Sequence, residues 1–305
     1  MNDLTAVITG ASSGLGLWTA RQLAPHASRL ALVCRDRARA EEAARFVKES
    51  APDSLRVDLW IADLSSLSSV RAAAMEMREA YSKVNVLINN AGAVFGPRRL
   101  SADGIELHLA TNYAGHFLLT ALLLDRLAAA PEARIINLTS FLHAFGRIRF
   151  HDLAYTHWYH VVPAYAQSKL ALVLFTCELA RRTRGLALTA NCVDPGVVRT
   201  GIHRGAGPIQ RQFAHPLLWF AKEPREGAES IAALALDPTF KGYTGQYFLR
   251  TRPRRPGRRG RDPDVSSLLW ERSCEWLEAR ERAALDMLLE SARAVSTSSD
   301  HRGSV

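Results

Sequence analysis

The sequence predicts a single α/β domain in which a parallel sheet of seven strands is covered by helices on both faces. Short, apolar, β-branched runs alternate with amphipathic helical segments, which is the pattern of a doubly wound sheet. No internal repeat is present and no polar linker interrupts the alternation before residue 249, so one domain is favoured over two. The 305 residues, 48% hydrophobic and 23% charged, suffice for a full core and exclude a disordered, collagen-like or disulfide-stapled chain.

Each expected strand is a short apolar run, and each expected helix repeats its apolar residues at intervals of three and four. In chain order the strands are TAVIT (5–9), RLALVC (29–34), LRVDLWI (55–61), VNVLIN (84–89), RIINL (134–138), LALTANCV (186–193) and, most weakly, GQYF (245–248). The helices between and after them are expected at 16–23, 38–50, 66–81, 104–129, 163–184 and 224–235. Residues 1–250 would form the domain, a loop and a helix within 251–290 would pack on it, and the small, polar residues 291–305 are expected to be disordered.

The positive charge of the chain is local. The net charge is +9, but residues 250–261 hold seven arginines and no acid, and the rest of the chain has 32 basic against 30 acidic side chains. A nucleic-acid-binding protein would line a face with basic residues and interleave aromatic ones, so that class is disfavoured. A solvated loop is the favoured interpretation, and contact with anionic membrane lipid or with an acidic carrier protein is the alternative.

The cysteines and the N-terminus favour a cytoplasmic protein. The four cysteines show no CxxC spacing and no histidine partner at metal-ligand spacing, so neither a disulfide framework nor a metal site is expected. Residues 1–5 lack the basic and apolar regions of a signal peptide, and the apolar run 118–124 ends at Asp125. No membrane span is expected.

A glycine-rich loop, TGASSGLG, leaves the first strand and enters the first helix. Gly10 would allow the tight turn, Gly14 would let backbone N–H groups approach a phosphate, and Gly16 would let the helix pack close to the sheet. This context predicts a dinucleotide site, and an ordinary strand-to-helix turn is the alternative.

The end of the second strand bears on the choice of dinucleotide. Many dinucleotide enzymes hold the adenine ribose with an acid there, whereas this chain reads Cys34-Arg35. Arg35 would bind a 2′-phosphate through a charge-assisted contact, which favours NADP over NAD. Asp36 is the alternative as ribose acceptor, while Arg37 and Arg39 are interpreted as solvated helix charges.

Further polar residues stand where the later strands end, at the edge of the sheet where α/β proteins build their sites. They are Asn89 to Gly92, Thr139-Ser140 and Asp194 to Gly196. Tyr165 and Lys169, four residues apart, would share one helix face. The ammonium group should lower the pKa of the tyrosine, so that it can exchange a proton with a substrate oxygen that Ser140 also holds.

In these motifs, TGASSGLG (9–16), NNAG (89–92), Ser140, YAQSK (165–169) and DPG (194–196), the chain resembles the short-chain dehydrogenase/reductase family over roughly residues 4–250. The resemblance implies a Rossmann-like domain with Tyr165 as general acid/base, Lys169 lowering its pKa, and Ser140 polarising the carbonyl. It implies that Asn112 supports a water that links Lys169 to solvent. The implied cofactor contacts are Gly10, Ser12, Ser13, Gly14, Leu15, Gly16, Arg35, Asp63, Leu64, Asn90, Ala91, Gly92, Tyr165, Lys169, Pro195, Gly196, Val198 and Thr200.

Within that family, the chain most resembles the retinol dehydrogenase and WW-domain oxidoreductase branch. The shared features are the 25 residues from Ser140 to Tyr165, the insert 147–153, and the segments CRD (34–36), DLSSL (63–67), SKLALVLFTCELARR (168–182) and PGVVRT (195–200). The resemblance implies NADP as cofactor and an apolar aldehyde, ketone or alcohol as substrate. Retinol enzymes of this branch usually carry an N-terminal membrane anchor, whereas the first strand here is expected at residue 5, so no anchor is expected.

The substrate side of the site should be apolar, because aromatic residues surround the catalytic positions. Two or three of these eight are expected to face the substrate: Phe141, Phe145, Tyr155, Trp158, Tyr159, Phe213, Trp219 and Phe220. Residues 202–223 are expected to form a mobile lid. An NADPH-dependent oxidoreductase is the favoured function because all four catalytic residues are present. A nucleotide-sensing or scaffold protein of the same fold is the alternative, and a homo-oligomer is compatible with either.

Overall fold

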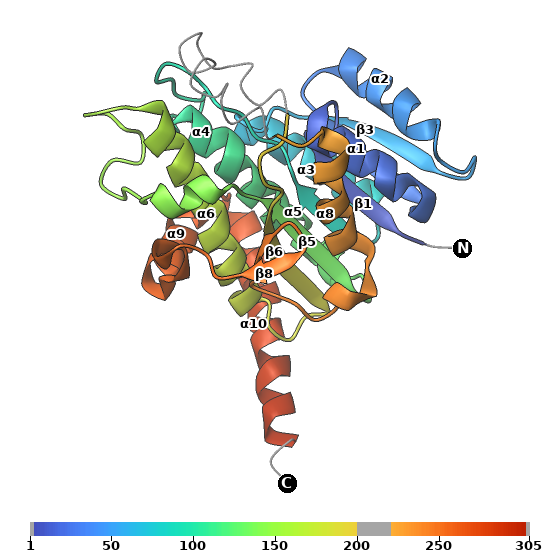
Figure 1. Cartoon of the computed structure of the whole chain (residues 1–305). Coiled ribbons are helices and arrows are strands. Elements are labelled where there is room, and N and C mark those ends of the chain that lie inside the picture. Colours follow the sequence, from blue (N-terminus) through green and yellow to red (C-terminus); the bar gives the residue numbers. More distant parts are fainter. Residues whose placement is uncertain (1–2, 200–220, 303–305) are drawn as a thin grey trace.

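The computed structural model describes residues 3–199 and 221–302. It contains one eight-stranded sheet in the order β3-β2-β1-β4-β5-β6-β7-β8 (Figure 1). Strands β1 to β7 are parallel, and only β8 runs antiparallel to its neighbour. The strands are β1 Thr5–Thr9, β2 Arg29–Cys34, β3 Arg56–Ile61, β4 Val86–Asn89, β5 Ala133–Leu138, β6 Leu188–Asp194, β7 Tyr247–Leu249 and β8 Arg252–Arg254.

Helices cover both faces of the sheet (Figure 1). One face packs against α1, α2 and α8, and the other against α3, α5 and α6, with α9 and α10 outside α5 and α6. The α-helices are α1 Gly14–Leu23, α2 Arg37–Lys48, α3 Leu67–Ala80, α4 Leu107–Leu109, α5 Gly115–Ala128, α6 Val161–Arg182, α8 Pro224–Leu236, α9 Pro263–Cys274 and α10 Ala279–Arg302. Shorter helical turns are η1 Ala24–His26, η2 Ala110–Ala114, η3 Phe141–Phe145, η5 Pro238–Phe240 and η6 Arg258–Arg261.

The central strands are buried on both faces, which explains why their sequences are largely apolar. In β1, Val7 packs into the cluster beneath α3, α5 and α6, whereas Ala6 and Ile8 pack into the cluster beneath α1 and α8. The side chains alternate between the two layers because successive residues of a strand point to opposite faces. The predicted doubly wound α/β fold is therefore confirmed.

The strand count and the loop prediction for 250–261 need correction. The sheet has eight strands rather than seven, because β8 forms a hairpin with β7 in which Phe248 pairs with Pro253. A proline is compatible with this position because β8 is an edge strand. The rest of the stretch includes η6, in which Gly260 is buried although the surrounding arginines are exposed.

The C-terminal region also differs from the expectation. The single helix expected at 266–290 is two helices, α9 and α10, separated by residues 275–278. The tail expected to be disordered from residue 291 instead continues α10 as far as Arg302 (Figure 1). Ala292 is fully buried, as are Leu285 and Leu289 nearby, so packing orders this helix beyond the apparent end of the apolar pattern.

The helical stretch Leu107–Ala128 is long and apolar enough to cross a membrane. However, 83% of its apolar window is buried within the protein. The stretch includes α4, η2 and α5, and α5 lies between the sheet and the C-terminal helices. The position of this stretch in the core therefore explains why it is so apolar.

Candidate active site

The carboxyl ends of the parallel strands bring the predicted site residues to one edge of the sheet. The strand order reverses between β1 and β4, and such reversals create the crevice in which open α/β sheets bind ligands. Thr9, Cys34, Asn89 and Asp194 end β1, β2, β4 and β6, and Ser140 lies two residues beyond β5.

Three of the four predicted catalytic side chains meet at this edge. Tyr165 and Lys169 lie one turn apart on α6, and Lys169 Nζ is 5.8 Å from the centre of the Tyr165 ring. The Ser140 side chain lies close enough to Tyr165 to act on the pKa of the phenol. Lys169 Nζ donates to the backbone oxygen of Leu138 at 2.9 Å, which fixes the amine at the end of β5. Both Tyr165 and Lys169 are buried.

Asn112, the fourth predicted residue, lies in the π-helical turn η2 between α4 and α5. Its Oδ1 accepts from Ala93 N at 2.9 Å, and its Nδ2 donates to Ser168 Oγ at 3.0 Å. Gly92 lies close to both Asn112 and Lys169: a Cβ on Gly92 would lie 3.3 Å from Lys169 Nζ and 3.6 Å from Asn112 Oδ1. A π-helical turn is common at functional sites because it re-aims the helix.

A buried hydrogen-bond network that the sequence analysis missed connects β1, β4 and α5. His116 Nδ1 is 3.0 Å from the backbone oxygen of Asn112, and His116 Nε2 is 2.9 Å from Thr9 Oγ1. The same Thr9 hydroxyl accepts from the backbone N–H groups of Asn90 and Ala91. Burial lowers the pKa of His116 to about 4, so the ring is neutral. Nδ1 then donates to the carbonyl, and Nε2 accepts from Thr9.

The electrostatics of the site differ from the expectation for Tyr165. Burial, followed by the nearby carboxylate of Asp194, raises the pKa of Tyr165, and the hydrogen bond from Ser140 opposes this rise. Burial lowers the pKa of Lys169 to about 8. The net shift of the Tyr165 pKa is therefore upward, because desolvation of the phenol dominates, and the lowering expected from Lys169 stays a prediction.

The glycine loop has the conformation expected of a phosphate-binding turn. Gly10 and Gly14 have φ values of +66° and +58°, which favour glycine. A Cβ on Gly16 would lie 2.4 Å from Asn90 Nδ2, so only glycine allows this approach of α1 to the loop. Ser13 occupies the N-cap of α1, but its side chain makes no capping hydrogen bond. The N-terminus of α1 therefore presents a positive dipole end without a side-chain acceptor.

The end of β2 carries an exposed basic pair. Arg35 and Arg39 are both exposed, and Arg39 is close enough to the Cys34 thiol to act on its pKa. Asp36 serves as N-cap of α2, where its Oδ1 accepts from Arg39 N at 2.9 Å. Ser12 of the glycine loop contacts the Cys34 side chain. The sequence analysis interpreted Arg39 only as a solvated charge, whereas the structure places it beside this site.

The predicted adenine contacts follow β3. Asp63 Oδ1 accepts from both the backbone N–H and the hydroxyl of Ser65, at 2.9 and 2.7 Å. Leu64 is buried against α5, where a Cβ on Gly115 would lie 2.3 Å from the Leu64 oxygen. The orientation of this turn is therefore fixed by packing on α5.

The turn after β6 approaches the start of α1. Pro195 is buried, and Gly196 has a φ of +81°. A Cβ on Gly227, in the first turn of α8, would lie 2.7 Å from Leu15 Cδ2 and 2.8 Å from Val198 Cγ2. Gly227, which the sequence analysis did not single out, thus allows two predicted cofactor residues to pack together.

Part of the predicted substrate side lies outside the described residues. This applies to most of the expected lid at 202–223 and to Phe213, Trp219 and Phe220, and the expected cofactor contact Thr200 also lies outside. Of the other aromatic candidates, Phe141, Phe145 and Trp158 are exposed, whereas Tyr155 is buried and belongs to the core.

A small apolar cluster surrounds Tyr165. Val94 and Val161 are buried with Tyr165, and Leu142 and Tyr159 pack against them. Tyr159 was among the aromatic candidates from the sequence, whereas Val94, Leu142 and Val161 were missed because they come from separate segments and no short motif marks them.

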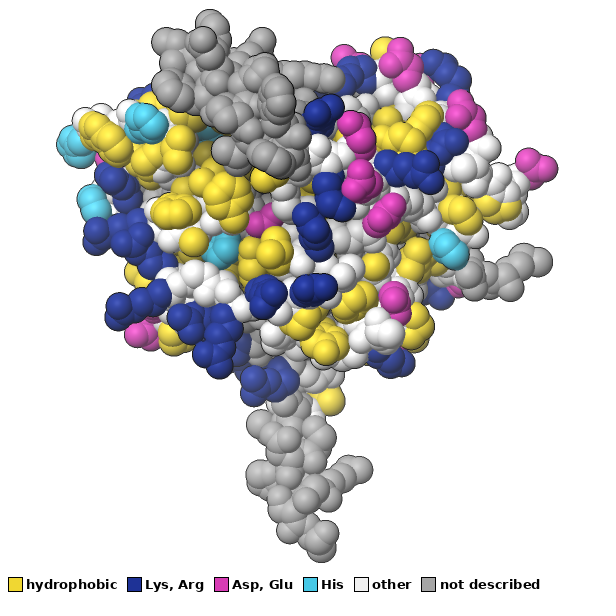
Figure 2. All heavy atoms as spheres, viewed as in Figure 1, with side chains coloured by type: hydrophobic (Ala, Val, Ile, Leu, Met, Phe, Trp, Pro, Cys, Tyr) yellow, Lys and Arg dark blue, Asp and Glu magenta, His cyan; other side chains and the backbone are white. Residues whose placement is uncertain are grey.

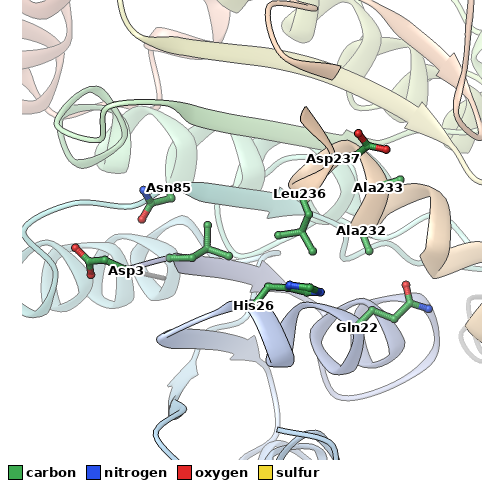
Figure 3. Close-up of a pocket in the computed structure, with 9 residues that line it drawn as sticks. Asp3, Gln22, His26, Asn85, Ala232, Ala233, Leu236 and Asp237 are labelled. Carbon is green, nitrogen blue, oxygen red and sulfur yellow. The ribbon is translucent and has the colours of Figure 1, made fainter. Parts of the chain in front are cut away.

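A pocket of about 610 Å³ lies away from these residues, at the side of the sheet where the parallel strands begin (Figure 3). Asp3 and Asn85 precede β1 and β4, Gln22 and His26 lie at the end of α1 and in η1, and Asp237 follows α8. None of the predicted site residues lines this pocket. Within residues 3–199 and 221–302, no group of three His, Cys, Asp or Glu side chains is arranged to hold a metal.

Comparisons with known proteins agree with the motifs. A family model described as short chain dehydrogenase matches residues 4–209. The sequence is 40% identical to retinol dehydrogenase 12 of Bos taurus over 279 residues, which is 90% of this chain and 86% of that protein. It is 38% identical to retinol dehydrogenase 13 of Homo sapiens over 275 residues, or 88% and 83% of the two chains. The crystal structure of an uncharacterised protein from Mycobacterium paratuberculosis superposes with a TM-score of 0.72 at 34% identity, covering 90% of this chain and 92% of that one.

Proposed function

Because the chain belongs to the short-chain dehydrogenase family, we propose that it is an NADP(H)-dependent oxidoreductase that interconverts an apolar aldehyde or ketone and its alcohol. The observation that carries this proposal is the meeting of Ser140, Tyr165 and Lys169 at the carboxyl edge of the sheet. The Ser140 hydroxyl is close enough to Tyr165 to act on its pKa, so we expect one substrate oxygen to contact both hydroxyl groups.

The chemistry of the reaction then divides between the cofactor and the side chains. NADP(H) supplies hydride transfer, which no side chain can perform. Tyr165 gives its phenolic proton to the substrate oxygen during reduction and takes a proton from it during oxidation. Ser140 donates a hydrogen bond that stabilises negative charge developing on that oxygen.

The titration properties of the site keep Tyr165 in the protonated form that reduction of a carbonyl requires. Because burial and Asp194 raise the pKa of Tyr165, the phenol is protonated at neutral pH and ready to donate. Lys169, whose pKa burial lowers to about 8, can exchange a proton near neutral pH. Its Nζ lies near Asn112 Oδ1, as their shared approach to Gly92 indicates. Lys169 would therefore return a proton to the tyrosine, and Asn112 would support the water through which Lys169 regains a proton from solvent.

The residues present fit NADP. The N-terminus of α1 can accept the pyrophosphate, because Ser13 leaves it without a side-chain cap and its first turn holds no acidic residue. Arg35 and Arg39 can pair with a 2′-phosphate. Asp36 is already engaged in capping α2, which weakens the case for it as a ribose acceptor and hence for NAD.

The test compares the wild type with Tyr165→Phe. Cofactor binding is measured by tryptophan fluorescence, and turnover by NADPH absorbance with a panel of apolar aldehydes and ketones. We expect tighter binding of NADPH than of NADH, the same NADPH affinity in both proteins, and a loss of turnover of about a hundredfold or more in the variant.

Each other outcome has a defined meaning. Turnover by Tyr165→Phe at the wild-type rate would contradict the role of the tyrosine. Preference for NADH would assign the ribose site to Asp36. Tight NADPH binding with no turnover of any apolar carbonyl compound or alcohol would favour a nucleotide-sensing or scaffold protein.

A further inference from the structure

The arginine-rich segment, residues 250–261, packs against the turn that carries Ser140. A Cβ on Gly257 would lie 2.9 Å from Ala144 Cα, so the two backbones are in contact there. Arg259 Nη1 donates to the backbone oxygen of Gly146 at 3.1 Å. Both contacts fall on η3 or on the residue that ends it. Figure 2 shows Lys and Arg side chains gathered on the face that carries β8.

His143 connects the segment to the serine turn through both ring nitrogens. Its Nδ1 is 2.7 Å from the backbone oxygen of Ser140, and its Nε2 is 3.1 Å from the backbone nitrogen of Gly257. A carbonyl oxygen only accepts and a backbone N–H only donates, so Nδ1 carries the proton and Nε2 does not. The ring is buried, and burial lowers the pKa of His143, which agrees with this neutral form.

A second set of contacts holds His143 from the side of β7. The rings of His143 and Tyr247 lie 4.9 Å apart, and the Tyr247 hydroxyl donates to Asp194 Oδ2 at 3.2 Å. Asp194 Oδ1 accepts from the backbone N–H of Gly196 at 2.8 Å. The ends of β5, β6 and β7 are therefore joined to the arginine-rich segment by one buried network.

We propose that His143 is a positioning residue that holds the Ser140 turn in its working geometry by tying it to the arginine-rich segment at Gly257. The segment is then part of the support of the active site, and its exposed arginines are the outer surface of that support. Residues that fix the orientation of a reacting group affect rate even though they do not touch the substrate. The kinetic part of this proposal rests on the proposed function, whereas its structural part does not.

The kinetic test uses His143→Phe, which retains a ring against Tyr247 but removes both hydrogen bonds. We expect kcat to fall about ten- to a hundredfold, with KM and NADPH affinity changed by less than about threefold. His143→Asn, which retains a donor near the Ser140 oxygen, should recover part of kcat. Combined with Ser140→Ala, His143→Phe should cause little further loss, because the positioned hydroxyl is already absent.

A variant on the other side of the contact provides an independent check. Gly257→Ala introduces a Cβ against Ala144 and should reproduce the fall in kcat, whereas Arg255→Ala, an exposed change in the same segment, should leave kcat unchanged. Wild-type kcat in both His143→Phe and Gly257→Ala would overturn the proposal. An equal loss from His143→Phe with and without Ser140→Ala would also overturn it, since it would indicate a general structural role.

A measurement that does not depend on turnover can test this proposal separately from the proposed function. In wild-type protein, nitrogen-15 spectra of the histidines should show His143 protonated at Nδ1 alone, and the Gly257 amide should exchange slowly with solvent. The exchange of that amide should accelerate in His143→Phe. If the wild type turns over no substrate but these signals are present, the proposed function fails while the tie between His143 and Gly257 stands. If the signals are absent, the tie itself is refuted.

Discussion

Lys169 has 2% of its surface exposed, and burial lowers its pKa from 10.5 to about 8. At pH 7 the native state must therefore keep a charged amine in a poorly solvated place. The folded protein binds fewer protons than the unfolded chain between pH 8 and 10.5, so this residue makes stability rise with pH across that window. Below pH 8 the residue lowers stability, with the Asp194 carboxylate offsetting part of the loss.

We accordingly expect Lys169→Met to raise the free energy of unfolding at pH 7 by up to about 3 kcal/mol while abolishing turnover. The advantage should shrink as pH rises from 8 towards 10.5, because the wild-type lysine then becomes neutral in the folded protein. Urea unfolding at several pH values checks this, with the exposed Lys48→Met as control. A Lys169→Met protein less stable than the wild type at pH 7 would show that the hydrogen bond to Leu138 outweighs desolvation.

The same residues show what the sequence could and could not predict at this scale. The identities and the meeting place of Ser140, Tyr165 and Lys169 follow from motif spacing and from the common edge at which parallel strands end. The direction in which the Tyr165 pKa shifts does not follow from the motifs, because it depends on how completely the phenol is desolvated and on Asp194 at the end of another strand. The partner atoms of His116 and His143 likewise come from segments far apart in sequence.

At the scale of elements, the strands were the most predictable part. A strand buried on both faces is mostly apolar, as β1 and β2 are apart from their terminal Thr5, Thr9 and Arg29, and the observed bounds of both strands equal the expected ones. By contrast β8 reads Arg-Pro-Arg and is fully exposed, so no hydrophobic pattern marks it, and only its pairing with β7 defines it. The break between α9 and α10 contains no proline or glycine, so tertiary packing determines it.

The packing of α1 on the glycine loop gives a prediction for a whole element. In Gly16→Ala the new Cβ would lie 2.5 Å from the backbone oxygen of Gly10, so the helix or the loop must move. We expect a loss of about 1–3 kcal/mol in stability and weaker NADPH binding. In Gly227→Ala the nearest atoms are side-chain methyl groups of Leu15 and Val198 rather than backbone, so stability should fall less.

Urea unfolding and fluorescence titration of the two glycine variants measure these effects. The comparison of the two variants distinguishes the effect of a clash with backbone atoms from the effect of a clash with side-chain atoms. Both clashes fall at the predicted cofactor site. A Gly16→Ala protein with the stability and NADPH affinity of the wild type would contradict the close approach of α1 to the loop.

At the scale of the whole molecule, the C-terminal helices cover the outer face of α5 and α6. Trp270 of α9 is buried with its ring 5.4 Å from that of Phe117 and 6.1 Å from that of Phe175. The hydroxyls of Ser273 and Tyr113 are 2.6 Å apart. An aromatic surface that could otherwise pair with a second subunit is thus used within the chain, and we expect the protein to be a monomer in solution.

Light scattering after size-exclusion chromatography tests this expectation against the mass of one chain, 33.7 kDa. Trp270→Ala should lower the free energy of unfolding by about 3–5 kcal/mol, because it leaves a cavity among the aromatic rings. Leu268→Ala, on the exposed side of the same helix, should change it by less than about 0.5 kcal/mol. A small effect of Trp270→Ala would mean that α9 is not part of the core. A wild-type dimer that Trp270→Ala does not affect would place the subunit contact on another face, because the face covered by α9 is already occupied.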